Sequence, residues 1–343
     1  MADIDKLIRQ NVKGLIPYSC ARDEFMGRDG IFLDANENPY GDLNRYPDPY
    51  QRELKAAISK IKGVPEENIF LGNGSDEIID LCFRIFCNPG SDKALTFTPT
   101  YGMYEVSAGI NDVRLIKIPL SDDFQIEYKR VQPELKDPAL KLIFICSPNN
   151  PTGNSMIGFE IESIVSGFGG IVVIDEAYID FSDQPSFRNL ISRYNNLIVM
   201  QTFSKSMGLA AARLGMAFMD STLAGYFNKM KPPYNISTPN QKAALKCLSH
   251  YELSKDKIRV IKNERERLAS ELEKISIIEK VFPSDSNFLL VKTGNADLIY
   301  SELVENKIIV RNRNKIVPGC LRITVGTKRE NDKLLGALRR IRI

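Results

Sequence analysis

A lysine in a loop of small residues is the first candidate for chemistry in this sequence. Lys205 lies in the segment QTFSKSMGLAAARLG, after an apolar run, and Ser204 and Ser206 flank it. Most lysines are ordinary surface residues, which is the alternative here. A lysine between a buried strand and an Ala/Gly-rich segment would lose part of its solvation, and this would lower its pKa and expose an amine nucleophile.

Two glycines in the segment IFLGNGSDE indicate a site for a phosphate. Gly72 and Gly74 follow a short apolar run, and Ser75, a candidate N-cap, precedes an apolar-periodic stretch. Backbone N–H groups at such a helix start bind anions, and glycine lets a ligand approach closely. The segment has neither the dinucleotide nor the P-loop glycine pattern. By itself it favours a phosphate cradle and an ordinary strand-to-helix turn about equally.

Polar residues follow two further apolar runs. The turn SPNNPTG comes after one run, and another ends in VVIDEAY with Asp175 and Glu176. In α/β proteins, ligands bind at the C-terminal ends of parallel strands. An unpaired buried carboxylate is costly, so we expect Asp175 to have a cationic partner. We expect Glu176 and Asp180 to be solvated or capping residues.

Together these four segments match the requirements of one cofactor. Pyridoxal phosphate needs a lysine for a Schiff base, an acid at its pyridine nitrogen and donors for its phosphate. All four segments follow apolar runs that are expected to be strands of one sheet. The sequence therefore predicts a pyridoxal phosphate site at the C-terminal ends of those strands.

The composition argues against several other classes. The 343 residues are 43% hydrophobic and 26% charged, and the net charge of +3 is not concentrated in a basic stripe for nucleic acid. No apolar run approaches the about 20 residues that span a bilayer, and the N-terminus has no apolar signal-peptide core. Six scattered cysteines and one histidine argue against disulfides and a metal site. We expect a cytoplasmic enzyme for small molecules, without metal, nucleic acid or membrane as partner.

Helical periodicity alternates with short apolar runs between residues 45 and 235. Tyr50–Lys62 has the pattern of an amphipathic helix. Several runs are almost entirely apolar, which is typical of strands with helices on both faces. The alternation predicts an α/β fold with a mainly parallel, mixed sheet between helices. The expected strands are 69–71, 94–97, 113–118, 142–146, 171–174, 197–201 and 214–219.

The pattern changes after Pro232 and Pro233, where a smaller α+β domain is expected. A long charged stretch at 240–273 favours helix, strands are expected at 288–291, 308–310 and 321–325, and a last helix at 330–340. We predict a large cofactor domain at 40–235 and a small domain at 236–343. Residues 1–39 are expected to pack with the small domain.

The segments GNGSDE, SPNNPTG, VVIDEAY and TFSKSMGLAAARLG, in this order, resemble the pyridoxal-phosphate-dependent class I/II aminotransferases of fold type I. The segments LIPYSCAR, LDANENPYG and RYPDP, with PYN and LRITVG further on, are similar to the histidinol-phosphate aminotransferases within that family. The resemblance spans essentially the whole chain. It implies that the enzyme interconverts L-histidinol phosphate plus 2-oxoglutarate and imidazole-acetol phosphate plus L-glutamate, in histidine biosynthesis.

The resemblance also implies roles for the matching residues. Lys205 would form the Schiff base and shuttle a proton, and Asp175 would pair with the pyridine N–H. Asn150 and Tyr178 would bind the 3′-oxygen of the ring, and Tyr101 would stack on its face. The cofactor phosphate would be bound by Gly74, Ser75, Asp76, Thr202, Ser204 and Arg213, and by Tyr46 of the other subunit of a homodimer with shared active sites.

For the substrate, the resemblance implies an anion site. Arg322 matches an arginine that binds a carboxylate or phosphate, and a planar guanidinium suits both anions. Arg311 matches a second such arginine, and Tyr18 and Asn36 match residues of the substrate pocket. Because Arg311 and Arg313 lie only two positions apart, we expect only one of them to reach the pocket.

Other functions stay open at this point. An aromatic amino acid aminotransferase of the same fold is the main alternative, followed by an amino-acid-phosphate decarboxylase. A non-catalytic pyridoxal phosphate binder is disfavoured because every catalytic position is filled. An oxidoreductase is disfavoured further because the dinucleotide glycine pattern is missing.

Overall fold

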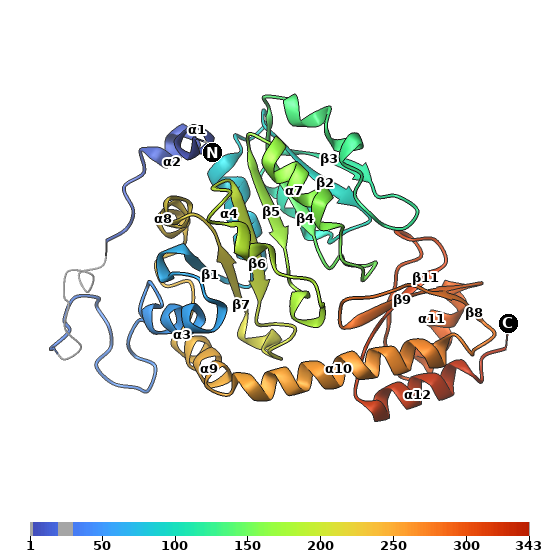
Figure 1. Ribbon diagram of the computed structural model, residues 1–343. Coiled ribbons are helices and arrows are strands. Elements are labelled where there is room, and N and C mark those ends of the chain that lie inside the picture. Colours follow the sequence, from blue (N-terminus) through green and yellow to red (C-terminus); the bar gives the residue numbers. More distant parts are fainter. Residues whose placement is uncertain (1–2, 20–29, 343) are drawn as a thin grey trace.

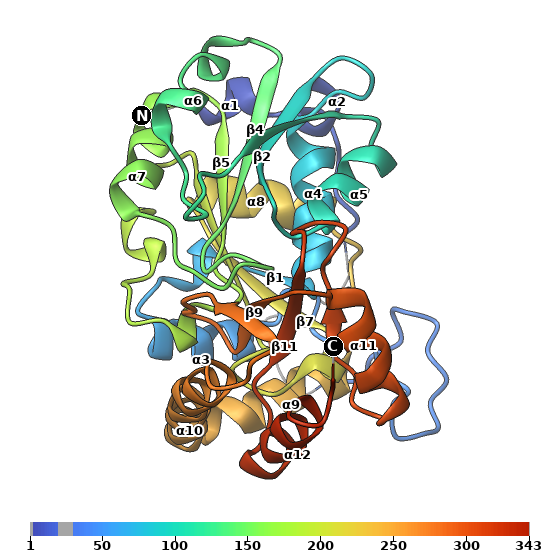
Figure 2. The same cartoon turned by 90° about the vertical axis from the view of Figure 1, so that its right-hand side faces the viewer.

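The computed structural model describes residues 3–19 and 30–342, which form a large and a small domain (Figures 1 and 2). The large domain is built around a seven-stranded sheet and the small domain around a four-stranded sheet. Helix α10 (Tyr251–Leu272) runs along the base of the view in Figure 1 from one domain to the other. The α/β prediction with a second, smaller α+β domain is confirmed.

The large sheet is mixed and mainly parallel, as predicted. Its strand order is β1-β7-β6-β5-β4-β2-β3. The strands from β6 to β3 in this order pair in parallel, whereas β7 runs antiparallel to both of its neighbours. All seven lie where the apolar runs predict them: β1 (Ile69–Asn73), β2 (Lys93–Thr98), β3 (Arg114–Pro119), β4 (Leu140–Cys146), β5 (Ile171–Asp175), β6 (Leu197–Thr202) and β7 (Leu214–Phe218).

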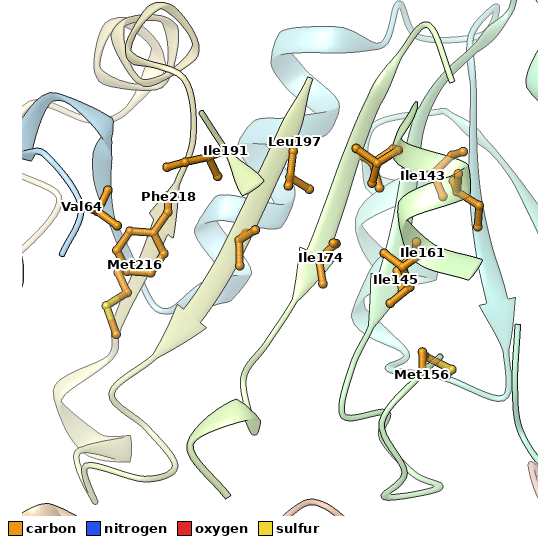
Figure 3. Close-up of a cluster of buried hydrophobic side chains, with 14 of the residues drawn as sticks. Val64, Ile143, Ile145, Met156, Ile161, Ile174, Ile191, Leu197, Met216 and Phe218 are labelled. Carbon is orange, nitrogen blue, oxygen red and sulfur yellow. The ribbon is translucent and has the colours of Figure 1, made fainter. Parts of the chain in front are cut away.

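Helices cover both faces of this sheet. Because side chains alternate along a strand, β5 sends Val172 and Ile174 into one core, and Ile171 and Val173 into the other. Figure 3 shows the first core, in which side chains of β4 to β7 lie beside Ile161 of the helix α7. The α-helices of this domain are α3 (Arg52–Lys62), α4 (Ser75–Phe86), α5 (Met103–Ile110), α6 (Tyr128–Val131), α7 (Gly158–Gly167), α8 (Ser221–Met230) and α9 (Thr238–Ser249).

The predicted amphipathic helix is α3, which is confirmed from Arg52 onward. Leu54 and Ile58, one turn apart, are buried in the first core. The helix ends at Gly63, which has a φ of 68° and forms a left-handed C-cap. Short 3₁₀ helices complete the domain: η2 (Glu66–Asn68), η3 (Glu134–Lys136), η4 (Ile179–Phe181), η5 (Phe187–Leu190) and η6 (Ala210–Ala212).

The small domain has an antiparallel sheet in the order β10-β11-β9-β8. Its strands are β8 (Ile278–Val281), β9 (Phe288–Thr293), β10 (Arg311–Asn312) and β11 (Cys320–Thr324), and its helices are α10, α11 (Ala296–Glu305) and α12 (Lys328–Leu338). The strand predicted at 308–310 is wrong. Ile308 and Val310 pack against the small-domain core, but ladder pairing with β11 starts only at Arg311.

The N-terminal segment packs on the large domain, not on the small one as predicted for residues 1–39. In α1 (Ile4–Leu7) and α2 (Gln10–Lys13), the side chains of Ile4, Ile8 and Val12 are buried in the second core of the large sheet. The Arg9 amide also donates to the carbonyl of Ile85 in α4 at 3.0 Å. Figure 1 shows both helices on the side of the large sheet away from the small domain. The prediction is therefore wrong for residues 4–13.

The large domain also continues past the predicted boundary at residue 235. Ala244 and Leu248 of α9 are buried in the first core of the large sheet. The buried small-domain core begins with Leu268, in the second half of α10. The charged stretch predicted as helix forms two helices, α9 and α10, that meet at His250. No helix in residues 3–19 or 30–342 combines the length and apolar character needed to cross a membrane.

Candidate active site

Most of the predicted site residues line one cavity of about 370 Å³. Side chains reach it from the C-terminal ends of β4, β5 and β6, from the start of α4, and from the small-domain strands β10 and β11. This is the end of a parallel sheet where ligands bind. The predicted residues in its wall are Ser75, Asp76, Tyr101, Asn150, Asp175, Tyr178, Thr202, Ser204, Lys205, Arg213, Arg311 and Arg322.

The start of α4 forms a cradle of backbone N–H groups. Gly74, with a φ of 78°, is its N-cap, and no side chain caps the helix. Ser75 is the first helical residue, so its expected role as N-cap is wrong. A Cβ on Gly74 would lie 2.6 Å from Nη2 of Arg213, and one on Gly215 would lie 2.6 Å from the backbone of Gly74 and Ser75. Glycine at both positions is what allows this close packing.

Three side chains add donors next to the cradle. Arg213 has a φ of 47°, and its Nη2 lies 3.1 Å from Oδ2 of Asp76. The hydroxyls of Thr202 and Ser204 are 3.1 Å apart, and the Ser204 amide donates to Thr202 Oγ1. A guanidinium, two hydroxyls and an uncapped helix start form a site suited to a phosphate.

Asp175 lies at the end of β5 and is 3% exposed. Its Oδ2 accepts a hydrogen bond from the Tyr104 hydroxyl at 2.8 Å, and its Oδ1 accepts one from the Ala177 amide at 3.0 Å. Burial raises the pKa of this carboxyl, and both hydrogen bonds act against that rise. Both hydrogen-bond donors are neutral. The sequence had predicted a cationic partner for this carboxylate, and among the described residues these two neutral donors take its place.

Lys205 projects into the same cavity from the loop after β6. The residue is exposed in the open cavity, but partial desolvation lowers the pKa of its amine, and the charge of Arg322 acts in the same direction. Its Nζ lies 5.7 Å from the centre of the Tyr178 ring. A larger neutral fraction of this amine makes it a better nucleophile and base.

The two carboxylates expected to be solvated or capping are structural instead. Glu176 is 1% exposed and accepts hydrogen bonds from the Ser186 hydroxyl, the Phe187 amide and the Gln201 amide group. Asp180 is half-buried and ties two site loops to α3. It accepts from the hydroxyl of Ser206, which follows Lys205, and pairs with Lys62 Nζ at 3.3 Å.

A short hydrogen-bonded chain connects the two domains inside the cavity. Nη1 of Arg322, on β11, donates to Asn150 Oδ1 at 2.5 Å, and Asn150 Nδ2 donates to the Tyr178 hydroxyl at 3.4 Å. Burial lowers the pKa of Arg322, and its Nε is a buried donor without a partner in the described residues. A desolvated guanidinium with an unused N–H is suited to bind an anion.

Both Arg311 and Arg313 line the cavity, so the expectation that only one would reach it is wrong. Arg311 pairs in register with Arg322 across β10 and β11, and residues two apart on a strand point to the same face. Burial and the charges of Arg322 and Arg311 lower the pKa of Arg313 to about 10. Its Nε is also buried without a partner among the described residues. Three arginines at one end of the cavity indicate a site for a strongly charged anion.

Gly74 contributes to the cradle without being part of the cavity wall, and three further predicted residues lie away from this cavity in a single chain. Tyr46 stacks on Tyr234 with ring centres 4.4 Å apart. Tyr46 and Asn36 line a different hollow, of about 540 Å³. Tyr18 is 68% exposed and does not line the first cavity. A single chain therefore does not bring these residues to Lys205.

Arg313 was a candidate from the sequence, and its two-residue spacing to Arg311 could have predicted that both reach the cavity, since residues two apart on a strand share a face. Tyr104, which lies next to the site, was missed. Tyr104 could have been found from its three-residue spacing to Tyr101 in the segment TPTYGMY, because positions i and i+3 share a helix face. Only the structure places its hydroxyl against Asp175.

The residues present fit pyridoxal phosphate. The uncapped α4 with Arg213 would take the phosphate, and Asp175, buried opposite neutral partners, would take a positively charged ring nitrogen. Lys205 would supply the amine that the aldehyde of the cofactor needs. Within the described residues, no cluster of three or more His, Cys, Asp or Glu side chains could hold a metal ion.

Comparisons with known proteins give the family. The model of aminotransferase class I and II matches residues 32–338. Histidinol-phosphate aminotransferases of Cytophaga hutchinsonii and Bacteroides fragilis are each 49% identical to this chain, over 98% and 99% of both sequences respectively.

Solved structures agree with the predicted fold type I architecture. The histidinol-phosphate aminotransferase of Clostridium acetobutylicum has a TM-score of 0.80 at 27% identity, over 87% of this chain and 90% of that chain. That of Sinorhizobium meliloti, in complex with pyridoxal-5′-phosphate, has a TM-score of 0.79 at 24% identity, over 89% and 88%. Matched over nearly its full length, this chain belongs to the class I and II aminotransferase family, in its histidinol-phosphate aminotransferase group.

Proposed function

We propose that this chain is a pyridoxal-phosphate-dependent aminotransferase of histidine biosynthesis. It would interconvert L-histidinol phosphate plus 2-oxoglutarate and imidazole-acetol phosphate plus L-glutamate. In the biosynthetic direction, L-glutamate would donate the amino group and imidazole-acetol phosphate would accept it. The observation that carries the proposal is the meeting, in one cavity, of Lys205, buried Asp175, the α4 cradle and three arginines. The names of the 49% identical relatives support the choice of substrate.

Residues of the large domain would hold the cofactor. When bound, pyridoxal phosphate supplies an aldehyde and an electron-accepting ring. Asp175 would keep the ring nitrogen protonated, Asn150 and Tyr178 would donate to the 3′-oxygen, and Tyr101 would cover the ring face. The phosphate would be held by Gly74, Ser75, Asp76, Thr202, Ser204 and Arg213, all at or beside the start of α4.

Lys205 would have two tasks in this reaction. Its ε-amine would attach the cofactor, and once free it would take the proton from the α-carbon of the amino donor and, in the second half of the reaction, give one to the α-carbon of the keto acceptor. Both tasks need a neutral amine, and the lowered pKa of Lys205 increases the fraction of the amine that is neutral near pH 7. The hydroxyl of Ser206, the residue after Lys205, donates to Asp180, and this contact would help to fix the loop that carries the amine.

Arg322, Arg311 and Arg313 would bind the anionic end of the substrate. A phosphate monoester carries close to two negative charges at neutral pH, and it accepts several N–H groups at once. Two buried Nε atoms, on Arg322 and Arg313, have no partner among the described residues and are available for this. Three guanidinium groups therefore favour a phosphate-bearing substrate over an aromatic amino acid with a single carboxylate.

A homodimer with shared active sites is part of the proposal. Tyr46, Asn36 and Tyr18 lie outside the cavity of their own chain, so they would act in the site of a second copy. The same segment leaves apolar side chains in solvent, with Ile16 89% exposed and Leu33 89% exposed. Burying such side chains against a partner is favourable.

A reducing cytoplasm is the compartment that we propose. Five cysteines in the described part of the chain are free thiols, and four of them are buried. Burial raises the pKa of Cys87 and Cys146, which keeps these thiols protonated and unreactive. Proteins of oxidising compartments more often pair their cysteines.

The substrate choice can be tested by spectroscopy on the holoenzyme. L-Histidinol phosphate is expected to convert the absorbance of bound cofactor from the aldehyde form to the amine form faster than phenylalanine or tyrosine does. Borohydride reduction followed by peptide mapping should place the cofactor label on Lys205. Faster conversion by the aromatic amino acids would replace the proposed substrate, and a label elsewhere would remove Lys205 from its role.

A further inference from the structure

We propose that Tyr104 is a positioning residue for Asp175: the buried hydroxyl of Tyr104 holds the Asp175 carboxylate as an anion in one orientation. Tyr104 does not line the cavity, so it would act through Asp175 and not on the cofactor itself. The inference rests on the proposed pairing of Asp175 with the ring nitrogen.

The phenol of Tyr104 is fixed on several sides. The side chain is fully buried, and its ring stacks on Phe144 of β4 with centres 5.0 Å apart and planes 17° apart. The ring of Tyr101 meets it edge-on, at 5.7 Å and 85°. With little freedom to turn, the hydroxyl stays 2.8 Å from Oδ2 of Asp175. A donor held this way fixes the plane of the carboxylate.

A neutral donor is the kind of partner that this carboxylate needs. A lysine or arginine at position 104 would cancel the charge of Asp175 before any ligand arrived. The phenol instead offsets part of the desolvation cost with a hydrogen bond and leaves the negative charge available to a cation in the cavity. This explains why the expected cationic partner is replaced by Tyr104 and the Ala177 amide.

Other ionisable groups near Asp175 do not replace this hydrogen bond. Asp76 acts to raise the pKa of Asp175, Lys205 acts to lower it, and the thiol of Cys146 lies beside both Asp175 and Tyr104. Among these contacts, only the phenol and the Ala177 amide donate hydrogen bonds to the carboxylate. Removing the phenolic oxygen therefore leaves one carboxylate oxygen without its donor.

The test uses Tyr104→Phe, which keeps both ring contacts and removes only the hydroxyl. The matched control is Tyr194→Phe, because the Tyr194 hydroxyl also donates to a carboxylate, Glu162 Oε1 at 2.9 Å, outside the cavity. The readout is the 15N resonance of holoenzyme whose cofactor is labelled at the ring nitrogen, which reports protonation directly. Asp175→Asn is measured alongside.

Without the phenolic donor, the carboxylate of Asp175 is free to turn away from the ring nitrogen and would pair with it less well. In the Tyr104→Phe holoenzyme, we therefore expect the ring nitrogen to lose its proton about one pH unit lower than in wild type. Cofactor affinity should fall about tenfold for the same reason. The Tyr194→Phe protein should match wild type in both measurements. An unchanged ring-nitrogen titration in Tyr104→Phe would overturn the inference.

The remaining outcomes separate the inference from the proposed function. If the nitrogen stays protonated in Asp175→Asn, the role of Asp175 itself is wrong. If Asp175→Asn shifts the titration and Tyr104→Phe does not, only the role of Tyr104 fails. Should Tyr104→Phe not fold, 3-fluorotyrosine placed at residue 104 offers a more acidic donor that draws charge from the Asp175 carboxylate, and the ring nitrogen should then lose its proton at lower pH. No shift with this analogue would equally contradict the inference.

Discussion

At the scale of single residues, the site combines charges that would repel each other in a protein without ligands. Arg322, Arg311 and Arg313 line one cavity. Arg322 acts to lower the pKa of Lys205 and Arg313, and Arg311 acts to lower that of Arg313 and Arg322. Asp175 is buried with neutral partners. These are costs to stability that an anion and a cationic ring would relieve, and this is common at functional sites.

The pKa of Lys205 offers a test at this scale. Arg322 lowers that pKa, so Arg322→Gln should raise it, and the pH at which the amine becomes neutral should move upward. The pH profile of Lys205 acetylation in the cofactor-free protein, followed by mass spectrometry, measures this midpoint. Arg193→Gln is the control, because Arg193 pairs with Glu162 at the surface. A midpoint that does not rise in Arg322→Gln would contradict this electrostatic coupling.

Gly74 offers a second residue-scale test. Gly74→Ala puts a Cβ 2.6 Å from Arg213 Nη2 at a φ of 78°, so we expect weaker cofactor binding and a loss of about 1–2 kcal/mol in the free energy of unfolding. Gly225→Ala is the matched control, since its Cβ would meet nothing within 4 Å in helix α8. That change should stabilise by about 0.5–1 kcal/mol. Cofactor titration by fluorescence and urea unfolding check both, and equal effects of the two substitutions would rule out the cradle.

At the scale of elements, sequence patterns located what depends on local periodicity. The apolar runs predicted all seven strands of the large sheet, because strands covered on both faces have few polar residues. The strand predicted at 308–310 was wrong because its apolar residues pack against the small-domain core, whereas pairing with β11 begins only at Arg311. Four motifs located residues that meet in one cavity, whereas the place of Tyr104 and the burial of Glu176 depend on contacts distant in sequence.

The docking of the N-terminal segment illustrates why long-range packing was not predictable. Ile4, Ile8 and Val12 form an apolar stripe that any hydrophobic face could bury, and only the fold shows which one does.

A substitution in this stripe tests the docking. Ile8→Ala should lower the free energy of unfolding by about 2–4 kcal/mol, because Ile8 is 4% exposed and the truncation leaves a cavity. Leu253→Ala, at a position 57% exposed on α10, is the control and should change it by less than about 0.5 kcal/mol. Urea unfolding measures both. A change in Ile8→Ala as small as in the control would mean that the N-terminal helices do not depend on this face.

At the scale of the whole molecule, the active site depends on parts that are separate in the sequence. The large domain supplies Lys205 and Asp175, and the small domain supplies Arg322, whose hydrogen bond to Asn150 joins the two. Tyr46 is expected to come from a second copy, since in its own chain it stacks on Tyr234 outside the cavity. Each site of the proposed dimer would then combine Lys205 of one chain with Tyr46 of the other.

Mixed dimers test this arrangement. Lys205→Ala and Tyr46→Ala proteins should each be nearly inactive alone, yet a mixed dimer would contain one site with both residues intact. If the two proteins are unfolded and refolded together in equal amounts, half of the dimers are mixed and each has one intact site, so about one quarter of wild-type activity should return. Mixing Lys205→Ala with Asp175→Ala is the control, because both residues belong to the same chain's cavity and no intact site can form. No more recovery in the first mixture than in the control would contradict shared sites, and so would a protein that elutes as a monomer with full activity.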